Sequence, residues 1–146
     1  MIINCTPHVV SVYNTRDCYV YDGCLRLRAG ELDSEDEFTQ PICTCGLAEP
    51  ICTYPASKNP ARVTFVQKPV GAVDGILIYR WFTEEIVNLP DPKPNTFYIV
   101  SKMVAQAWST REDLIFPGTL VCDAEDNVIG CIDFSRIYVI PSLLKF

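Results

Sequence analysis

The feature that most limits the possible folds is a proline-rich stretch at residues 89–95. It reads Leu-Pro-Asp-Pro-Lys-Pro-Asn, with prolines at positions 90, 92 and 94. Proline has no backbone N–H, so prolines this close together prevent both a helix and a central strand. The stretch is therefore predicted to be a stiff, extended connector that delivers the chain to the segment beginning at Phe97.

The segment after this connector changes its structural preference at Ser101. Residues 97–100 are aromatic or β-branched, which is typical of a strand. The following residues favour a helix, and serine is a common residue just before the first helical turn. We therefore expect a short strand, a sharp turn at Ser101 and one short helix at about residues 101–108.

Most of the remaining chain has the pattern of short strands. Asp74-Gly75 between two β-prone arms is a strong hairpin signal, and the apolar returning arm at 76–82 is predicted to be central. The other β-prone runs are 9–13, paired with 18–21, then 24–28, 62–67, 119–122, paired with 128–134, and 136–140. The predicted fold class is α+β with β dominant, a single domain spanning 1–146 with mostly antiparallel strands and one short helix. The larger aromatic residues are predicted to lie in the core: Tyr79, Trp81, Phe82, Tyr98 and Trp108. One or two of them could instead lie at the rim of a pocket and stack on a base.

An irregular excursion at about residues 29–60 departs from this pattern. It contains an acidic run at 31–37 and cysteines at positions 43, 45 and 52. Their C-x-C-x₆-C spacing lacks the paired C-x₂-C signature of a structural zinc site, and Cys18, Cys24 or His8 would have to complete one. We therefore assign no metal and favour reduced or loop-bridging thiols.

Charge and hydropathy exclude some partners. The chain has 146 residues, with 12 basic and 18 acidic side chains and a net charge of −6. Such a charge repels a phosphate backbone, which argues against duplex nucleic acid. No run reaches the roughly 18 apolar residues of a membrane helix, and the first residues lack the basic region of a signal peptide. We expect a cytoplasmic protein without a membrane partner or a cofactor.

The strongest candidate ligand site surrounds the predicted helix start. Ser101, Arg111, Asp113 and Arg62 could form it, with a helix end and two guanidinium groups receiving a phosphate or carboxylate. Asp113 could orient an arginine or accept a ribose hydroxyl. The alternative is purely structural, with Ser101 as an ordinary helix cap and Arg111 paired with Asp113.

His8 is the only histidine and lies in a Thr-Pro-His turn before the first strands. It could bind the ligand or act as a general base, or it could be a structural donor that fixes the turn. No glycine-rich nucleophile turn surrounds Ser101, so no catalytic residue is assigned.

Several short motifs, taken in order, resemble a known family. They are Asn4-x-Thr-Pro-His8, Pro55-x-Ser57 with Ala61-Arg-Val63, Leu89-Pro-x-Pro92, Tyr98-Ile-Val-Ser-x-x-Val-Ala105 and Arg111-x-Asp-Leu-x-x-Pro117. Together they resemble a family of small, functionally uncharacterised proteins of phages, prophages and some bacteria. The resemblance implies a phage context, and the host-cell cytoplasm as location, and it implies no activity.

Two classes of function remain open. The first is a phage-type accessory protein for host takeover or anti-defence, in its sharper form a sponge that sequesters a nucleotide-like immune signal. Such a protein is expected to be a homo-oligomer, because sheet edges and exposed apolar strands need cover. The second is a small nucleotide-directed hydrolase that uses His8. An acidic protein that docks on and inhibits a host protein is a further alternative. We favour binding without catalysis.

Overall fold

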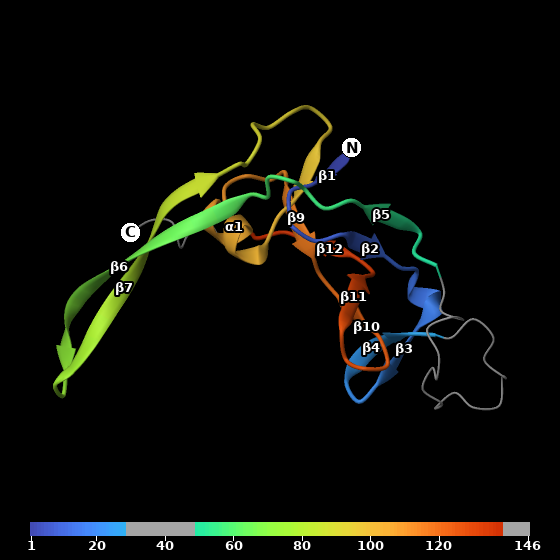
Figure 1. Ribbon diagram of the computed structural model, residues 1–146, viewed down its shortest axis with the longest axis horizontal. Helices are drawn as coiled ribbons and strands as arrows, with labels where there is room; N and C mark the ends of the chain where they lie inside the picture. Colours follow the sequence, from blue (N-terminus) through green and yellow to red (C-terminus); the bar gives the residue numbers. More distant parts are fainter. Residues whose placement is uncertain (29–48, 139–146) are drawn as a thin grey trace. The chain divides into compact units, whose positions relative to one another are not determined.

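Strands form most of the regular structure, so the β-dominant class with one short helix is confirmed. The computed structural model describes residues 1–28 and 49–138 (Figure 1). The strands are β1 Ile2–Asn4, β2 Val10–Val12, β3 Cys18–Tyr21, β4 Cys24–Leu27, β5 Cys52–Tyr54, β6 Arg62–Val73, β7 Ile76–Val87, β8 Phe97–Ile99, β9 Leu114–Pro117, β10 Leu120–Cys122, β11 Val128–Cys131 and β12 Phe134–Ser135. The helix α1 spans Lys102–Ala107, and a 3₁₀ turn, η1, spans Thr15–Asp17.

The described residues form two compact units. Unit 1 contains residues 1–7, 57–115 and 136–138, and unit 2 contains residues 8–28, 49–56 and 116–135. Strand β9 contributes to both units, because the chain passes from unit 1 to unit 2 between Ile115 and Phe116. No helix in the described part of the chain has the length and hydropathy needed to cross a membrane.

The core of unit 1 is built on strand β8. This strand pairs in parallel with β1 on one side and with β9 on the other. Strands inside a parallel sheet are covered on both faces and are therefore apolar at successive positions, which explains the Tyr-Ile-Val run at 98–100. The largest fully buried side chains of this unit are Tyr98, Ile99, Leu114, Val100 and Val104.

Unit 2 is organised around a six-stranded sheet with the strand order β3-β4-β10-β11-β2-β5. Its buried cluster combines Tyr13, Cys18, Leu27 and Val121. As the alternation of β4 predicts, Leu27 and Arg26 point to opposite faces. Arg26 is nevertheless buried, because its guanidinium pairs with Asp126 and donates to the Asp123 carbonyl oxygen.

The prediction of mostly antiparallel strands is wrong, because the sheets are mixed. Parallel pairs join β1 to β8, β8 to β9, β4 to β10 and β2 to β11. Each of these pairs connects segments that are distant in sequence or separated by other elements. Turn signals report only local antiparallel hairpins, so they could not reveal these pairings.

Two other expectations from the sequence need correction. The predicted hairpin between 9–13 and 18–21 does not form, since β2 pairs with β5 and β11 while β3 pairs with β4. The described part of the predicted strand 136–140 has no strand conformation. Residues 29–48 of the predicted excursion lie outside the described residues, and residues 52–54 of it form strand β5.

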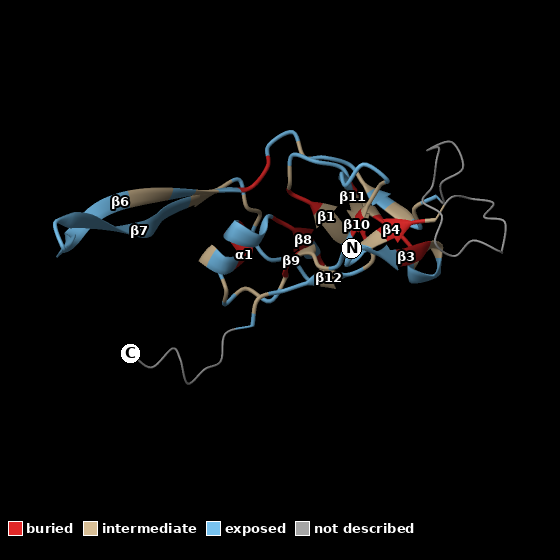
Figure 2. Ribbon diagram, turned by 90° about the horizontal axis from the view of Figure 1, so that it is seen from below, coloured by how far each residue is buried: buried red, intermediate tan, exposed pale blue. Residues whose placement is uncertain are grey.

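Strands β6 and β7 form a long two-stranded hairpin, which we call the arm. Each strand has 12 residues, and the turn between them is Asp74-Gly75, as predicted. Residues 67–85 are all exposed, so the prediction that 76–82 forms a central strand is wrong (Figure 2). In the part of the chain that is described, no third strand pairs with the arm.

Candidate functional site

Ser101 is the N-terminal cap of helix α1. Its backbone is extended (φ −66°, ψ 154°), and its side-chain oxygen accepts a hydrogen bond from the backbone N–H of Val104 at 3.3 Å. This contact satisfies one of the N–H groups left without a partner at a helix start. The capping role considered from the sequence is therefore present.

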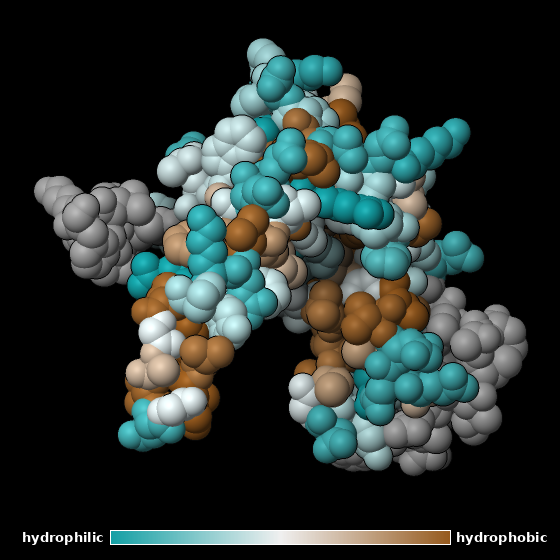
Figure 3. Space-filling view, turned by 60° about the vertical axis from the view of Figure 1, so that its left-hand side comes forward, coloured by the Kyte–Doolittle hydropathy of each residue, from teal (hydrophilic) through white to brown (hydrophobic). Residues whose placement is uncertain are grey.

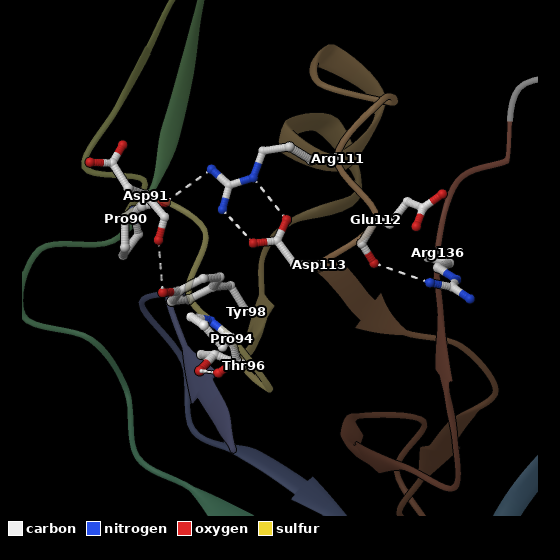
Figure 4. Close-up of polar contacts among 9 residues, drawn as sticks. All are labelled: Pro90, Asp91, Pro94, Thr96, Tyr98, Arg111, Glu112, Asp113 and Arg136. Atoms are coloured by element: carbon white, nitrogen blue, oxygen red, sulfur yellow. Dashed lines mark hydrogen bonds and ion pairs between the residues drawn. The ribbon is translucent and has the colours of Figure 1, made fainter.

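Arg111 and Asp113 form a two-pronged ion pair. The Arg111 Nε donates to Asp113 Oδ1 at 2.8 Å, and its Nη2 donates to Oδ2 at 2.6 Å (Figure 4). The Arg111 side chain is 7% exposed and that of Asp113 is 17% exposed. This fork geometry orients both groups and strengthens the contact.

The remaining surface of the Arg111 guanidinium contacts other groups of unit 1. Its Nη1 donates to the Pro90 carbonyl oxygen at 2.9 Å, and its central carbon lies 5.1 Å from the Trp108 ring centre and 5.7 Å from that of Tyr98. The Tyr98 hydroxyl donates to the Asp91 carbonyl oxygen at 3.1 Å (Figure 4). Arg111 thus holds the proline-rich connector against β8 and the end of α1, which supports the structural interpretation of this residue.

The ion pair shifts the pKa of both partners. The hydrogen bond from Arg111 lowers the pKa of Asp113, although partial burial opposes this change. The hydrogen bond to Asp113 correspondingly raises the pKa of Arg111. Both groups are charged at neutral pH. The negative charge of Asp113 offsets the positive charge of Arg111, so the pair attracts an anionic ligand less than a lone arginine would.

The other two predicted site residues lie in different places. Arg62 is the exposed first residue of β6 and pairs with Val87 in the ladder. His8 is exposed and belongs to unit 2, whereas Arg62, Ser101, Arg111 and Asp113 belong to unit 1. Of the five residues, the structure brings Arg111 and Asp113 into direct contact.

The described cysteines are free thiols. Cys5, Cys18 and Cys131 are buried, and burial raises the pKa of Cys131 to about 11. Among residues 1–28 and 49–138, no group of three His, Cys, Asp or Glu side chains could hold a metal ion. Cys43 and Cys45 lie outside the described residues.

The arm is a candidate site that the sequence interpretation missed. It presents large apolar side chains to solvent, including Ile76 at 70%, Trp81 at 63% and Leu77 at 61% exposure. Further exposed apolar side chains of the arm are Val70, Val73, Ile78, Tyr79 and Phe82. The space-filling view shows hydrophobic side chains along this hairpin, at the lower left (Figure 3). Exposed large apolar side chains in this number make the arm a candidate interaction surface.

The strand register gives the arm two different faces. On one face, which we call the aromatic face, Gln67 opposes Trp81 and Pro69 opposes Tyr79. The Phe65 and Trp81 rings on this face are 5.9 Å apart. On the other face, which we call the charged face, Lys68 opposes Arg80, and the Lys68 ammonium lies 6.0 Å from the Phe82 ring centre.

The prediction that the large aromatic residues form the core is mostly wrong, and the reason also explains why the arm was missed. An apolar strand has the same composition whether its own domain or a partner covers it. Tyr98 is buried as predicted, whereas Tyr79, Trp81, Phe82 and Trp108 are exposed. The Lys68–Arg80 pair does not suit a buried strand, but the turn at Asp74-Gly75 alone would place Lys68 opposite Trp81. The bulge between Pro69 and Gly71 shifts Lys68 to Arg80, so the pair could not be predicted from the turn.

No protein-family model matches this chain, and comparison with curated proteins and with solved structures also gives no match.

Proposed function

We propose that this protein is a binding protein that works as a homo-oligomer, with the arm as its self-association element. The observation that carries the proposal is the exposure of all residues from 67 to 85, which include eight large apolar side chains. No other described segment of unit 1 exposes as many large apolar side chains.

The energetics of an isolated ribbon support this proposal. A two-stranded hairpin alone is marginally stable in water, and additional strands or a packed face are needed to hold it. Burial of one large apolar side chain stabilises an assembly by about 2 kcal/mol. The arm has 12 residues in each strand, which is comparable to the roughly 20–30 residues that one partner contributes to a stable interface.

The wider role that we propose is a phage-type accessory protein that binds without catalysis. The sponge hypothesis receives less support than the assembly hypothesis, because the Arg111 guanidinium already contacts Asp113, Pro90 and two aromatic rings. The His8 hydrolase and the acidic docking protein remain predictions without a supporting contact.

The test is the molar mass of the purified protein in solution, measured by sedimentation over a range of concentrations. We expect an oligomer that dissociates on dilution, and we expect Trp81→Glu to make it monomeric at the same concentrations. The matched control is Val128→Glu, because Val128 is 58% exposed but lies in unit 2. A wild-type protein that is monomeric at all concentrations would contradict the proposal.

A further inference from the structure

The two edges of the arm differ in their capacity to pair with another strand. Strand β6 contains Pro69, which has no N–H to donate, and its register shifts between Pro69 and Gly71. This bulge leaves Val70 without a direct partner on β7. Strand β7 has no proline, and each of its residues from Ile76 to Phe82 has a direct partner on β6. The β7 edge is therefore the one suited to strand addition.

The turn determines which backbone groups of β7 face this open edge. Asp74 and Gly75 have φ angles of 51° and 77°, as a two-residue hairpin turn of the favoured type requires. The pair that flanks such a turn, Val73 and Ile76, is a hydrogen-bonded pair, and the pairs alternate from there. The N–H and C=O groups of Leu77, Tyr79 and Trp81 therefore point away from β6.

We propose that two copies of the protein join through β7, edge to edge and antiparallel, around a two-fold axis at Tyr79. This inference rests on the proposed self-association of the arm and specifies its geometry. The product is a continuous four-stranded sheet with the order β6-β7-β7-β6. In this register, Tyr79 pairs with Tyr79 of the second copy, and the outward N–H and C=O groups of both strands face each other.

The side chains select this register among those that a two-fold axis allows. With the axis at Tyr79, Leu77 opposes Trp81 of the second copy, and Ile76 opposes Phe82. These aromatic–aliphatic pairs across neighbouring strands are favourable. Arg80 opposes Ile78 and not a second cation.

Each neighbouring register of the β7 pair has an unfavourable contact that the axis at Tyr79 lacks. An axis at Arg80 places two guanidinium groups directly opposite each other, and like charges at that position are destabilising. An axis at Trp81 extends the pairing to Glu84. This residue has no β6 partner, because the register shifts between Thr64 and Phe65, so the new pairing would include an irregular part of β7. An axis at Ile78 places Trp81 opposite the turn residue Gly75. The axis at Tyr79 avoids all three problems.

The first experiment is residue-resolved amide hydrogen exchange, measured above and below the concentration at which the protein self-associates. We expect the N–H groups of Leu77, Tyr79 and Trp81 to exchange at least roughly tenfold more slowly in the associated state. Their cross-strand neighbours Gln67 and Ala72, whose N–H groups face the β6 edge, should not change. Protection of Gln67 and Ala72 instead, or of neither set, would overturn the β7 pairing.

The second experiment compares Tyr79→Lys with Gln67→Lys by sedimentation. Both positions lie on the aromatic face, but only the first places two lysines opposite each other at the axis. We expect Tyr79→Lys to raise the dimer dissociation constant by roughly tenfold or more and Gln67→Lys to change it by less than about threefold. Equal weakening by both variants would indicate face-to-face stacking and overturn the edge pairing, while leaving self-association intact. A wild-type monomer would instead contradict the proposed function.

Discussion

A single side chain, Arg111, connects three segments of unit 1. It donates to the Asp113 carboxylate and the Pro90 carbonyl, and it lies against the Trp108 and Tyr98 rings. Because the proline-rich connector has no ladder hydrogen bonds of its own, contacts of this kind fix its position on β8.

Replacement of this arginine is expected to destabilise the fold. Arg111→Met keeps most of the apolar stem but leaves the partly buried Asp113 carboxylate without its partner. We expect a loss of about 3 kcal/mol in the free energy of unfolding, measured by denaturant titration at pH 7. Arg62→Met is the control, because Arg62 is exposed, and its effect should stay within about 0.5 kcal/mol.

The effect of the Arg111 substitution should also depend on pH. The pKa of Asp113 is lower in the folded protein than in the unfolded chain, so the unfolded state takes up the proton first on acidification. The ion pair therefore contributes fully to the free energy of unfolding above the pKa of Asp113 in the unfolded chain, about 3.9. This contribution is lost as the pH falls through the pKa of Asp113 in the folded protein. The difference between wild type and Arg111→Met should narrow from pH 7 to pH 3, and a constant difference would contradict this account.

Residues that carried the family resemblance have local structural roles. The Asn4 side-chain oxygen accepts hydrogen bonds from both the backbone N–H and the hydroxyl of Thr6. Ser101 caps α1 by accepting from Val104, and Arg111 pairs with Asp113. The short-range part of the candidate site, a cap and an i, i+2 ion pair, was therefore predictable from sequence as the structural alternative.

Several elements that depend on local preferences were predicted well, although the hairpin of 9–13 with 18–21 was not. The helix at 102–107, the turn at Asp74-Gly75 and the hairpin of β10 with β11 all agree with the sequence. Parallel partners were not predictable, because the pairing of β8 with β1 is encoded only by long-range packing. The burial of β7 was also mispredicted, since an apolar strand does not reveal whether it is covered by its own unit.

The turn of the arm gives a prediction for this element alone. Gly75 has a φ of +77°, which a β-branched residue adopts only with strain, so Gly75→Val should loosen the hairpin near its tip. We expect faster amide exchange at Val73 and Ile76, the hydrogen-bonded pair that flanks the turn, with the unfolding midpoint of the whole protein nearly unchanged. The control Ala72→Val introduces valine in the adjacent strand and should slow exchange at the same sites.

For the molecule as a whole, the arm should be removable. We expect that a protein with residues 66–82 replaced by Asn-Gly, which leaves the Phe65–Thr83 pair beside the new turn, stays folded and becomes monomeric. Because residues 67–85 are exposed, this change removes few core contacts, and the free energy of unfolding should change by less than about 1 kcal/mol.

This comparison must be made at a protein concentration at which the wild type is also a monomer, since association itself adds stability. Circular dichroism and the mass in solution are the two measurements. A shortened protein that fails to fold would mean that the arm stabilises unit 1 as a monomer, contrary to our interpretation of its exposure.

In the proposed dimer, Pro69 would also limit how large the assembly can become. When two arms join through β7, the outer rims of the new sheet are the two β6 strands, and each rim is interrupted by this proline and the adjacent bulge. A further chain that adds at either rim meets a missing donor, so growth stops at two copies instead of continuing into a fibril. For the proposed dimer, the absence of one backbone N–H would thus make the difference between a closed complex and open-ended polymerisation.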